Sequence, residues 1–354
     1  MEHFTYCHNN QGFASPRSRI FHSIFNRVSR SLFICHRSCS VRRSAKLSVA
    51  IWSQPGINIQ SRFCESIRKG DSFKKRAMSS EDREADASKS SNEFLEVANR
   101  LADAAAEITL KYFRTPIDII DKLDKSPVTV ADQAAEKAMR LIIAQHFPSH
   151  AIYGEEGGLS SPEYATEYTW VLDPIDGTKS FITGKPLFGT LIALVQGGIP
   201  ILGIIDQPVL KERWIGQRGQ PTTLNGKEVK TRSCTSLSNG YMYTTSPHLF
   251  AGQAEAAYER LRKKVKVPLY GCDCYAYGLL AAGHVDLVVE SGLKPYDYLA
   301  LVPVVEGSGG IITNWNGQSL RWWPSMEPSE MTADIIAAGA ADVYRDALEI
   351  LTKR

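Results

Sequence analysis

Two carboxylates follow a short apolar run in the stretch Trp170-Val171-Leu172-Asp173-Pro174-Ile175-Asp176-Gly177-Thr178. A hydrophobic strand that ends in this way would send Asp173 and Asp176 into one small volume, where like charges repel unless a cation lies between them. Carboxylate oxygens, with the backbone carbonyl of Ile175, are ligands that suit Mg²⁺. The Gly177-Thr178 turn offers backbone N–H groups that can hold a phosphate. The stretch therefore indicates phosphate-ester chemistry, although Asp-Pro and Asp-Gly pairs are also common in plain turns.

The composition is that of an ordinary globular protein. Of the 354 residues, 43% are hydrophobic and 22% are charged, so the chain can form one large domain or two modest ones with real cores. No apolar run approaches the roughly 20 residues that span a bilayer, and we expect no membrane segment. Beyond residue 78 the cysteines are Cys234, Cys272 and Cys274, without a Cys-x-x-Cys pair, which argues against a disulfide framework or a zinc site.

The first 70 residues are strongly basic. They contain eleven Lys and Arg residues but only two acidic ones, with serines interleaved among the arginines. Such a segment is typical of an organelle transit peptide, and we expect residues 1–78 to be one, directed to the chloroplast or, as the alternative, to the mitochondrion. A basic disordered tail that binds nucleic acid or membrane is the competing interpretation. Residues 79–91 are expected to be a linker and residues 92–354 the folded domain, in two sub-domains of about 92–235 and 236–354.

Hydrophobic periodicity predicts alternating helices and strands. Helices are expected from Ser91 to Pro116 and over residues 132–146, 248–264, 273–282 and 297–307. Strands are expected at 151–153, 169–172 and 285–290, with a hairpin formed by 187–195 and 199–205 and a final strand–helix pair from Asp334 onward. Because hairpins interrupt the alternation, an α/β fold with mixed sheets between helix layers (α+β in character) is predicted, rather than a purely parallel sheet.

Three further carboxylates lie where they could join the first pair. Glu155, in the Gly-Glu-Glu-Gly motif at 154–157, follows a predicted strand and could meet Asp173 at a neighbouring strand end. Asp132 and Asp297 each begin a predicted helix. Each has a plainer alternative: an exposed acidic loop for Glu155, and a helix N-cap for the two aspartates. The residues alone leave these alternatives open.

Together the motifs resemble one known family. The segment Gly154-Glu155-Glu156, the run from Asp173 to Thr178, and Tyr296-Asp297 followed by Ala300 are similar to motifs of the inositol monophosphatase family of Mg²⁺-dependent, lithium-sensitive phosphomonoesterases. The resemblance covers nearly all of residues 92–353 and implies a layered α-β-α-β-α fold like that of fructose-1,6-bisphosphatase. Within the family, residues 270–278 and 290–297 resemble the histidinol-phosphate phosphatase branch. With the basic N-terminal segment, the chain is similar to the plant, plastid-targeted members of that branch.

The resemblance implies a role for each motif residue. The implied ligands of two or three Mg²⁺ ions are Glu155, Asp173, the carbonyl of Ile175, Asp176 and Asp297. Thr178, paired with Asp132, and Glu155 would orient and deprotonate a water that the metal activates. The amides of Gly177 and Thr178 would hold the phosphate. The resemblance also implies inhibition by Li⁺ and a homodimer, and it gives no reason to expect a nucleic-acid or membrane partner.

Asp273 and Glu290 are carboxylates that the metal would not need. The resemblance implies that the substrate is held by Gly177, Thr178, Cys272, Asp273, Glu290 and Asp297. L-Histidinol phosphate, an intermediate of histidine biosynthesis, carries an ammonium group and an imidazole that two carboxylates can hold. Inositol offers only hydroxyls, and its phosphatases usually have Gly-Thr-Ala where this chain has Gly271-Cys272-Asp273.

Several alternatives to histidinol phosphate stay open. The alternative substrates are myo-inositol 1-phosphate, L-galactose 1-phosphate and a bisphosphate nucleotide. The alternative to an enzyme is a non-catalytic, metal-binding role for the whole chain. For Asp273 itself, the alternative is a plain helix cap.

Overall fold

The computed structural model describes residues 80–121, 127–162, 167–326 and 331–353, with side chains from Ser91 onward. Its helices are α1 (Ser80–Tyr112), α2 (Val130–His146), α3 (Thr178–Ile182), α4 (Gln253–Arg262), α5 (Tyr275–Ala281), α6 (Pro295–Tyr298), α7 (Leu301–Gly307) and α8 (Ala341–Thr352). Its strands are β1 (Ile119–Asp121), β2 (Pro127–Thr129), β3 (Ala151–Gly154), β4 (Gly158–Ser160), β5 (Tyr168–Asp176), β6 (Gly189–Gln196), β7 (Ile199–Gln207), β8 (Glu212–Gln217), β9 (Thr223–Leu224), β10 (Lys227–Glu228), β11 (Tyr241–Thr244), β12 (Val267–Tyr270), β13 (Leu287–Leu293), β14 (Ile311–Asn314) and β15 (Ala333–Ala338).

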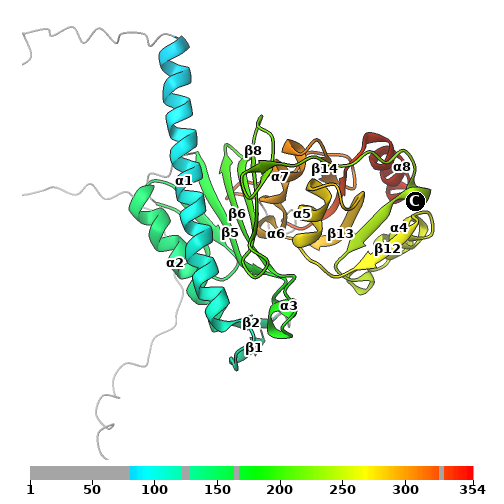
Figure 1. Cartoon of the computed structure of the whole chain (residues 1–354), viewed down its shortest axis with the longest axis horizontal. Coiled ribbons are helices and arrows are strands. Elements are labelled where there is room, and N and C mark those ends of the chain that lie inside the picture. Colours follow the sequence, from blue (N-terminus) through cyan, green and yellow to red (C-terminus); the bar gives the residue numbers. More distant parts are fainter. Residues whose placement is uncertain (1–79, 122–126, 163–166, 327–330, 354) are drawn as a thin grey trace, which may run out of the picture. The chain divides into compact units, whose positions relative to one another are not determined.

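The described elements stack as alternating layers of helices and sheets (Figure 1). Helices α1 and α2 cover one face of an eight-stranded sheet with the order β10-β9-β8-β7-β6-β5-β3-β4. Helices α5, α6 and α7 lie between this sheet and a five-stranded sheet with the order β12-β11-β13-β15-β14. Helices α4 and α8 cover the outer face of the second sheet. This arrangement confirms the predicted α-β-α-β-α fold with mixed sheets.

Strand β5 separates two hydrophobic cores. Successive side chains of a strand point to opposite faces of the sheet. Trp170 and Leu172 therefore pack with α1 and α2, while Val171 packs into the central layer with residues of the second sheet such as Val288. Asp173, two residues after Val171, is expected to face the central layer as well. The pleat of one strand thus aims the first carboxylate at the space between the sheets.

The first helix begins earlier than predicted. Helix α1 starts at Ser80, not at Ser91, so residues 80–91 are helical where a linker was expected. Their sequence contains four Ser and two each of Ala, Glu and Asp, with one Lys and one Arg, and it contains no Gly or Pro that would break a helix. The predicted transit segment, 1–78, lies outside the described residues. Within the described residues, no helix is both long and apolar enough to cross a membrane.

Other elements differ in extent from the sequence prediction. The predicted helix 297–307 is divided into α6 and α7, and α4 begins only after a short 3₁₀ turn at Pro247–Leu249. Strand β5 continues through Asp176, whereas the prediction ended it at Leu172. Strands β11, β12 and β14 were not predicted, because four residues offer too few alternations to be recognised.

Candidate active site

A β-bulge brings the first two carboxylates to the same face of the sheet. Along the β5–β6 ladder, Asp173 pairs with Leu191 and Asp176 pairs with Gly189, so three steps on β5 oppose two steps on β6. In a regular strand, residues three apart point to opposite faces. The extra residue on β5 shifts the alternation by one, so the side chains of Asp173 and Asp176 point to the same face of the sheet. The bulge is held by the Ile175 amide, which donates to Oδ1 of Asp173 (3.0 Å).

Parallel pairing places Glu155 beside Asp173. Strands β3 and β5 run parallel, with Gly154 opposite Leu172. The Glu155 amide continues this ladder by donating to the Leu172 carbonyl (3.1 Å). The next residue along each chain is therefore a carboxylate, and after burial the charge of Glu155 is the largest cause of the raised pKa of Asp173. The expected meeting of two strand ends is what the structure shows.

Asp297 reaches the same volume from the second half of the chain. It occupies the third position of α6, and its Oδ2 accepts the amide hydrogen of Lys294 (2.8 Å). It does not occupy the N-cap position itself. One carboxylate oxygen from each of Asp173, Asp176 and Asp297 lies within 4.8 Å of the others. Such a triad suits a hard cation that prefers oxygen ligands.

The cluster is electrostatically costly without a cation. Burial, and then repulsion from Glu155, Asp176 and other carboxylates, raises the pKa of Asp173 well above its usual range. Burial, with repulsion from Asp273 and Asp297, does the same to the pKa of Asp176. Among the described residues, no Lys or Arg forms an ion pair with either of these two aspartates. The donor set therefore fits a divalent cation, which would favour the ionised forms.

Asp132 lies beside the cluster with one carboxylate oxygen available. It is fully buried at the third position of α2, where its Oδ2 accepts hydrogen bonds from the amide (2.9 Å) and hydroxyl (2.5 Å) of Thr129. Its Oδ1 is buried and has no hydrogen-bond partner. The expected pairing with Thr178 is absent, because the Thr178 hydroxyl donates to the Ile175 carbonyl (3.1 Å).

Gly177 and Thr178 begin the short helix α3. Gly177 has φ +85° and occupies the N-cap position. A helix's first amides have no acceptor within the helix and point outward from its N-terminus. They therefore lie directly after Asp176, at the edge of the acidic cluster. Their role in holding a phosphate stays a prediction.

A left-handed loop carries Asp273 to α3. Gly271, Cys272 and Asp273 have φ values of +85°, +82° and +44°. The Asp273 Oδ2 accepts a hydrogen bond from the Ser180 hydroxyl (3.2 Å), and the next amide, that of Cys274, donates to Oδ2 of Asp176 (2.6 Å). Burial raises the pKa of Asp273, against opposing effects of Ser180 and nearby lysines. Asp273 does not cap α5, whose N-cap position is Cys274, so the helix-cap alternative is wrong.

Glu290 is buried and accepts three hydrogen bonds from two threonines. Its side chain accepts hydrogen bonds from the Thr245 amide (2.8 Å), the Thr245 hydroxyl (2.9 Å) and the Thr244 hydroxyl (3.3 Å). Only 2% of the residue is exposed. Burial raises its pKa to about 8 despite these donors, and the charge of Asp273 adds to the rise. Asp273 and Glu290 are therefore close enough to interact electrostatically.

Sequence reasoning missed two buried polar residues here. Glu136 accepts two backbone amide hydrogens from the turn that follows Glu155. The Tyr277 hydroxyl is buried without a partner, and burial, with the charges of Glu290 and other carboxylates, raises its pKa well above its usual range. A signal existed for Glu136, because it lies four residues after Asp132 and so shares its helix face. Tyr277 gave no signal of its own.

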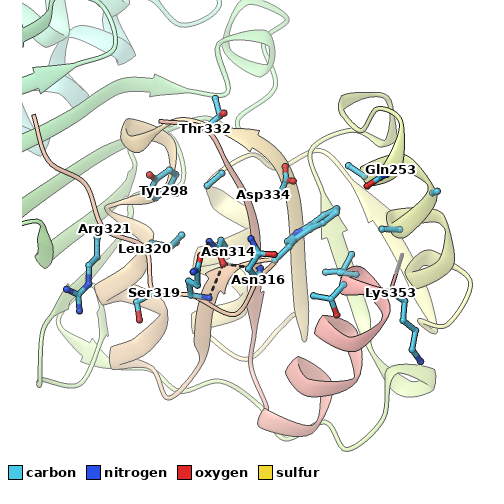
Figure 2. A pocket seen from close by; sticks show the side chains of 18 of the residues that line it. Gln253, Tyr298, Asn314, Asn316, Ser319, Leu320, Arg321, Thr332, Asp334 and Lys353 are labelled. Atoms are coloured by element: carbon cyan, nitrogen blue, oxygen red, sulfur yellow. Dashed lines mark hydrogen bonds between the residues drawn. The ribbon is translucent and has the colours of Figure 1, made fainter. Parts of the chain in front are cut away.

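A separate cavity of about 940 Å³ contains none of the clustered carboxylates. Figure 2 shows its wall, with Gln253 on α4, Asn314 and Asn316 near the end of β14, and Lys353 after α8. Asp334, on the same wall, accepts hydrogen bonds from the Ser291 hydroxyl (2.6 Å) and the Gly292 amide (3.1 Å). The cavity is thus distinct from the acidic cluster.

Comparison with known proteins places this geometry among phosphatases. The model of the inositol monophosphatase family matches residues 90–351. The chain is 63% identical over 258 residues to the chloroplastic bifunctional phosphatase IMPL2 of Arabidopsis thaliana, covering 73% of this chain and 75% of that protein. It is 34% identical to the histidinol-phosphatase of Chlorobaculum parvum, covering 63% of this chain and 86% of the relative. Among solved structures, an inositol monophosphatase from Zymomonas mobilis is 46% identical with a TM-score of 0.66, covering 74% of this chain and 98% of that one.

Proposed function

This chain belongs to the inositol monophosphatase family, and on that premise we propose that it is a Mg²⁺-dependent phosphatase that hydrolyses L-histidinol phosphate to L-histidinol and phosphate. The main support for metal-dependent hydrolysis is that the carboxylates of Asp173, Asp176 and Asp297 lie close together. The observation that carries the substrate is the second pair of carboxylates, Asp273 and Glu290, which lies beside them.

The metal would be held by Glu155, Asp173, Asp176, Asp297 and the carbonyl of Ile175. This set offers only oxygen atoms, as Mg²⁺ prefers. Two or three ions would offset the repulsion that raises the pKa of Asp173 and Asp176. Bound Mg²⁺ would polarise the phosphoryl group and lower the pKa of water at the site. Li⁺ is expected to compete for the same carboxylates.

The remaining chemistry belongs to the chain's own side chains and amides. The unpartnered Oδ1 of Asp132 is a suitable acceptor for the Thr178 hydroxyl once that hydroxyl leaves the Ile175 carbonyl. Thr178 would then take a proton from the attacking water while passing its own hydroxyl proton to Oδ1 of Asp132, with Glu155 as the second base. The outward-facing amides of Gly177 and Thr178 would hold the phosphate. Neither a thiol nor an imidazole is required, and burial raises the pKa of both Cys272 and Cys274, which disfavours a thiolate.

The substrate preference rests on charge. Asp273 and Glu290 would hold the cationic ammonium and imidazole end of histidinol phosphate, with Cys272 in the same loop as a neighbouring contact. A hydrogen bond to a charged group is worth about 1.5–3 kcal/mol, whereas a neutral polyol gains less from a carboxylate. Relatives named histidinol-phosphatase in Chlorobaculum parvum and Mycobacterium tuberculosis support this assignment.

A second substrate class is favoured by two comparisons. The Arabidopsis relative is called bifunctional, and the Zymomonas mobilis structure is of an inositol monophosphatase. We therefore propose a weaker side activity on myo-inositol or L-galactose 1-phosphate at the same site. The chloroplastic relative also supports a plastid location for this protein, and the family resemblance supports a homodimer.

Replacing Asp273 by Asn tests the substrate proposal. The Asp273→Asn variant should lower kcat/KM for histidinol phosphate by about tenfold or more, because a charge-assisted hydrogen bond is lost. Activity on myo-inositol 1-phosphate should change by less than about threefold. Ser180→Ala is the matched control, because it removes the hydrogen-bond donor to Asp273 but keeps the charge. Equal losses on both substrates in Asp273→Asn would contradict the role of Asp273 in specificity.

A further inference from the structure

Glu136 is a buried carboxylate that the proposed chemistry does not use. Only 2% of the residue is exposed. It lies on α2, one turn after Asp132, and faces the turn between β3 and β4. Its Oε2 accepts the amide hydrogen of Glu156 (2.8 Å), and its Oε1 accepts that of Gly157 (2.8 Å). One side chain therefore binds the two consecutive amides that follow Glu155.

The glycines of the motif make room for this carboxylate. A Cβ atom at Gly154 would lie 2.4 Å from Oε1 of Glu136, and one at Gly157 would lie 2.8 Å from the same oxygen. Any side chain at either position would displace Glu136 from the turn. The glycines that flank the two glutamates are thus explained by close approach of a side chain from α2.

Arg140 completes the arrangement. Its Nε donates to Oε1 of Glu136 (2.7 Å), and its Nη2 donates to the Gly158 carbonyl (2.6 Å). A buried carboxylate is tolerated when it is paired and its lone pairs are satisfied. The turn is therefore held at its amides by Glu136 and at its carbonyl by Arg140.

Both peptide units that flank Glu155 are fixed as a result. The Glu155 amide donates to Leu172 of β5, and the following amide donates to Glu136 of α2. We propose that Glu136, supported by Arg140, is a positioning residue that holds Glu155 against Asp173 and so sets the affinity of the metal centre. This inference rests on the proposed function, because it assumes that Glu155 is a metal ligand.

Metal binding by Glu136→Gln tests the inference. A glutamine presents an NH₂ group to one of the two amides, so that contact is lost. Mn²⁺ serves as the probe, and free Mn²⁺ is counted by electron paramagnetic resonance during titration of the purified protein. Half-saturation should require about tenfold more Mn²⁺ than in the wild type, the scale typical of groups that orient a ligand. Because free metal is counted directly, the result does not depend on turnover.

Asp286→Asn is the matched control for general destabilisation. Asp286 is also a buried carboxylate, and it pairs with Arg232 (2.7 Å) and accepts one backbone amide hydrogen, that of Tyr241 (2.7 Å). Its replacement should lower Tm but leave Mn²⁺ binding unchanged. Unchanged Mn²⁺ binding in Glu136→Gln, or equal weakening in both variants, would overturn the proposal.

Arg140→Met provides a second variant if Glu136→Gln does not fold. It leaves the carboxylate on the two amides but removes its charge partner, so a smaller weakening in the same direction is expected. Wild-type binding of Mn²⁺ by Arg140→Met would count against the proposal. Absence of Mn²⁺ binding by the wild-type protein is a different result, which would overturn the metal centre itself and the positioning role with it.

Discussion

At the residue scale, Glu290 shows how burial can outweigh hydrogen bonding. Three donors from Thr244 and Thr245 stabilise its ionised form, yet its pKa rises to about 8 because the group is removed from water. Below that pH Glu290 is largely protonated in the free protein. A cationic substrate group would favour the ionised form and lower the pKa again. The preference for a substrate with an ammonium group, which keeps its charge in this range, should therefore strengthen as pH rises toward 8.

The same shift predicts a pH-dependent stability. The pKa of Glu290 rises from 4.5 to about 8 on folding. The folded protein thus binds more protons than the unfolded chain between these values. The stability that Glu290 contributes is fully present below pH 4.5 and is lost as pH rises through 8, with a slope of at most about 1.4 kcal/mol per pH unit.

Glu290→Gln should flatten this dependence. The free energy of unfolding in urea, measured in EDTA between pH 5 and 8.5, should fall less steeply with pH in the variant than in the wild type. Carboxylates with a raised pKa that do not interact with Glu290 contribute equally to both proteins, so the difference reports Glu290 together with its neighbours Asp273 and Tyr277. If the free energy of unfolding fell equally steeply with pH in both proteins, the raised pKa of Glu290 would be contradicted.

At the element scale, the site depends on irregularities that the sequence indicated only in part. Local chemistry indicated Asp173 and Asp176, because acidic residues directly after an apolar strand are recognisable, whereas the choice of Glu155 over an exposed acidic loop depended on the family resemblance. The bulge in β5 was missed, because a ladder register depends on the partner strand. The Thr178–Asp132 pairing is not formed in this structure, where the Thr178 hydroxyl donates to the Ile175 carbonyl instead.

Gly177→Ala tests the junction between α3 and the loop at 271–274. Gly177 has φ +85°, and a Cβ there would lie 2.8 Å from Oδ2 of Asp273. Strain at such a position costs about 1–3 kcal/mol, and the crowded carboxylate adds to it. We expect a lower Tm and a raised KM for phosphate esters, measured by thermal unfolding and steady-state kinetics.

Gly219→Ala isolates the effect of the contact. Gly219 has a similar φ of +78°, but nothing lies within 4 Å of its Cβ position. It should show the backbone strain alone and an unchanged KM. A Gly177→Ala variant that matches Gly219→Ala in both measurements would mean that α3 and Asp273 are not in close contact in solution.

At the scale of the whole folded unit, the acidic cluster draws on both sheets. Asp173 and Asp176 come from β5 of the first sheet, whereas Asp297 follows β13 of the second. The central core joins side chains of both sheets. The sequence predicted the fold through family resemblance, but no local pattern could show that residues so far apart in the chain meet. Metal binding should therefore bridge the two halves of residues 92–354.

The N-terminal segment gives a prediction for the whole chain. A fluorescent protein fused behind residues 1–78 should enter chloroplasts in plant cells, because the segment is basic, Ser-rich and poor in acidic residues. Microscopy of the fusion, beside a fusion that carries residues 79–354 instead, provides the test. Import into mitochondria would favour the alternative location, and retention outside organelles would contradict a transit peptide.

The most direct test of the central claim is phosphate release by the purified protein. Release from L-histidinol phosphate and from myo-inositol 1-phosphate should be compared, with Mg²⁺ and with EDTA. Our account predicts rapid release from histidinol phosphate, slower release from inositol phosphate, and loss of both in EDTA. Preference for inositol phosphate would contradict the roles of Asp273 and Glu290. Release that survives EDTA, or no release from either ester, would contradict the metal-dependent phosphatase itself.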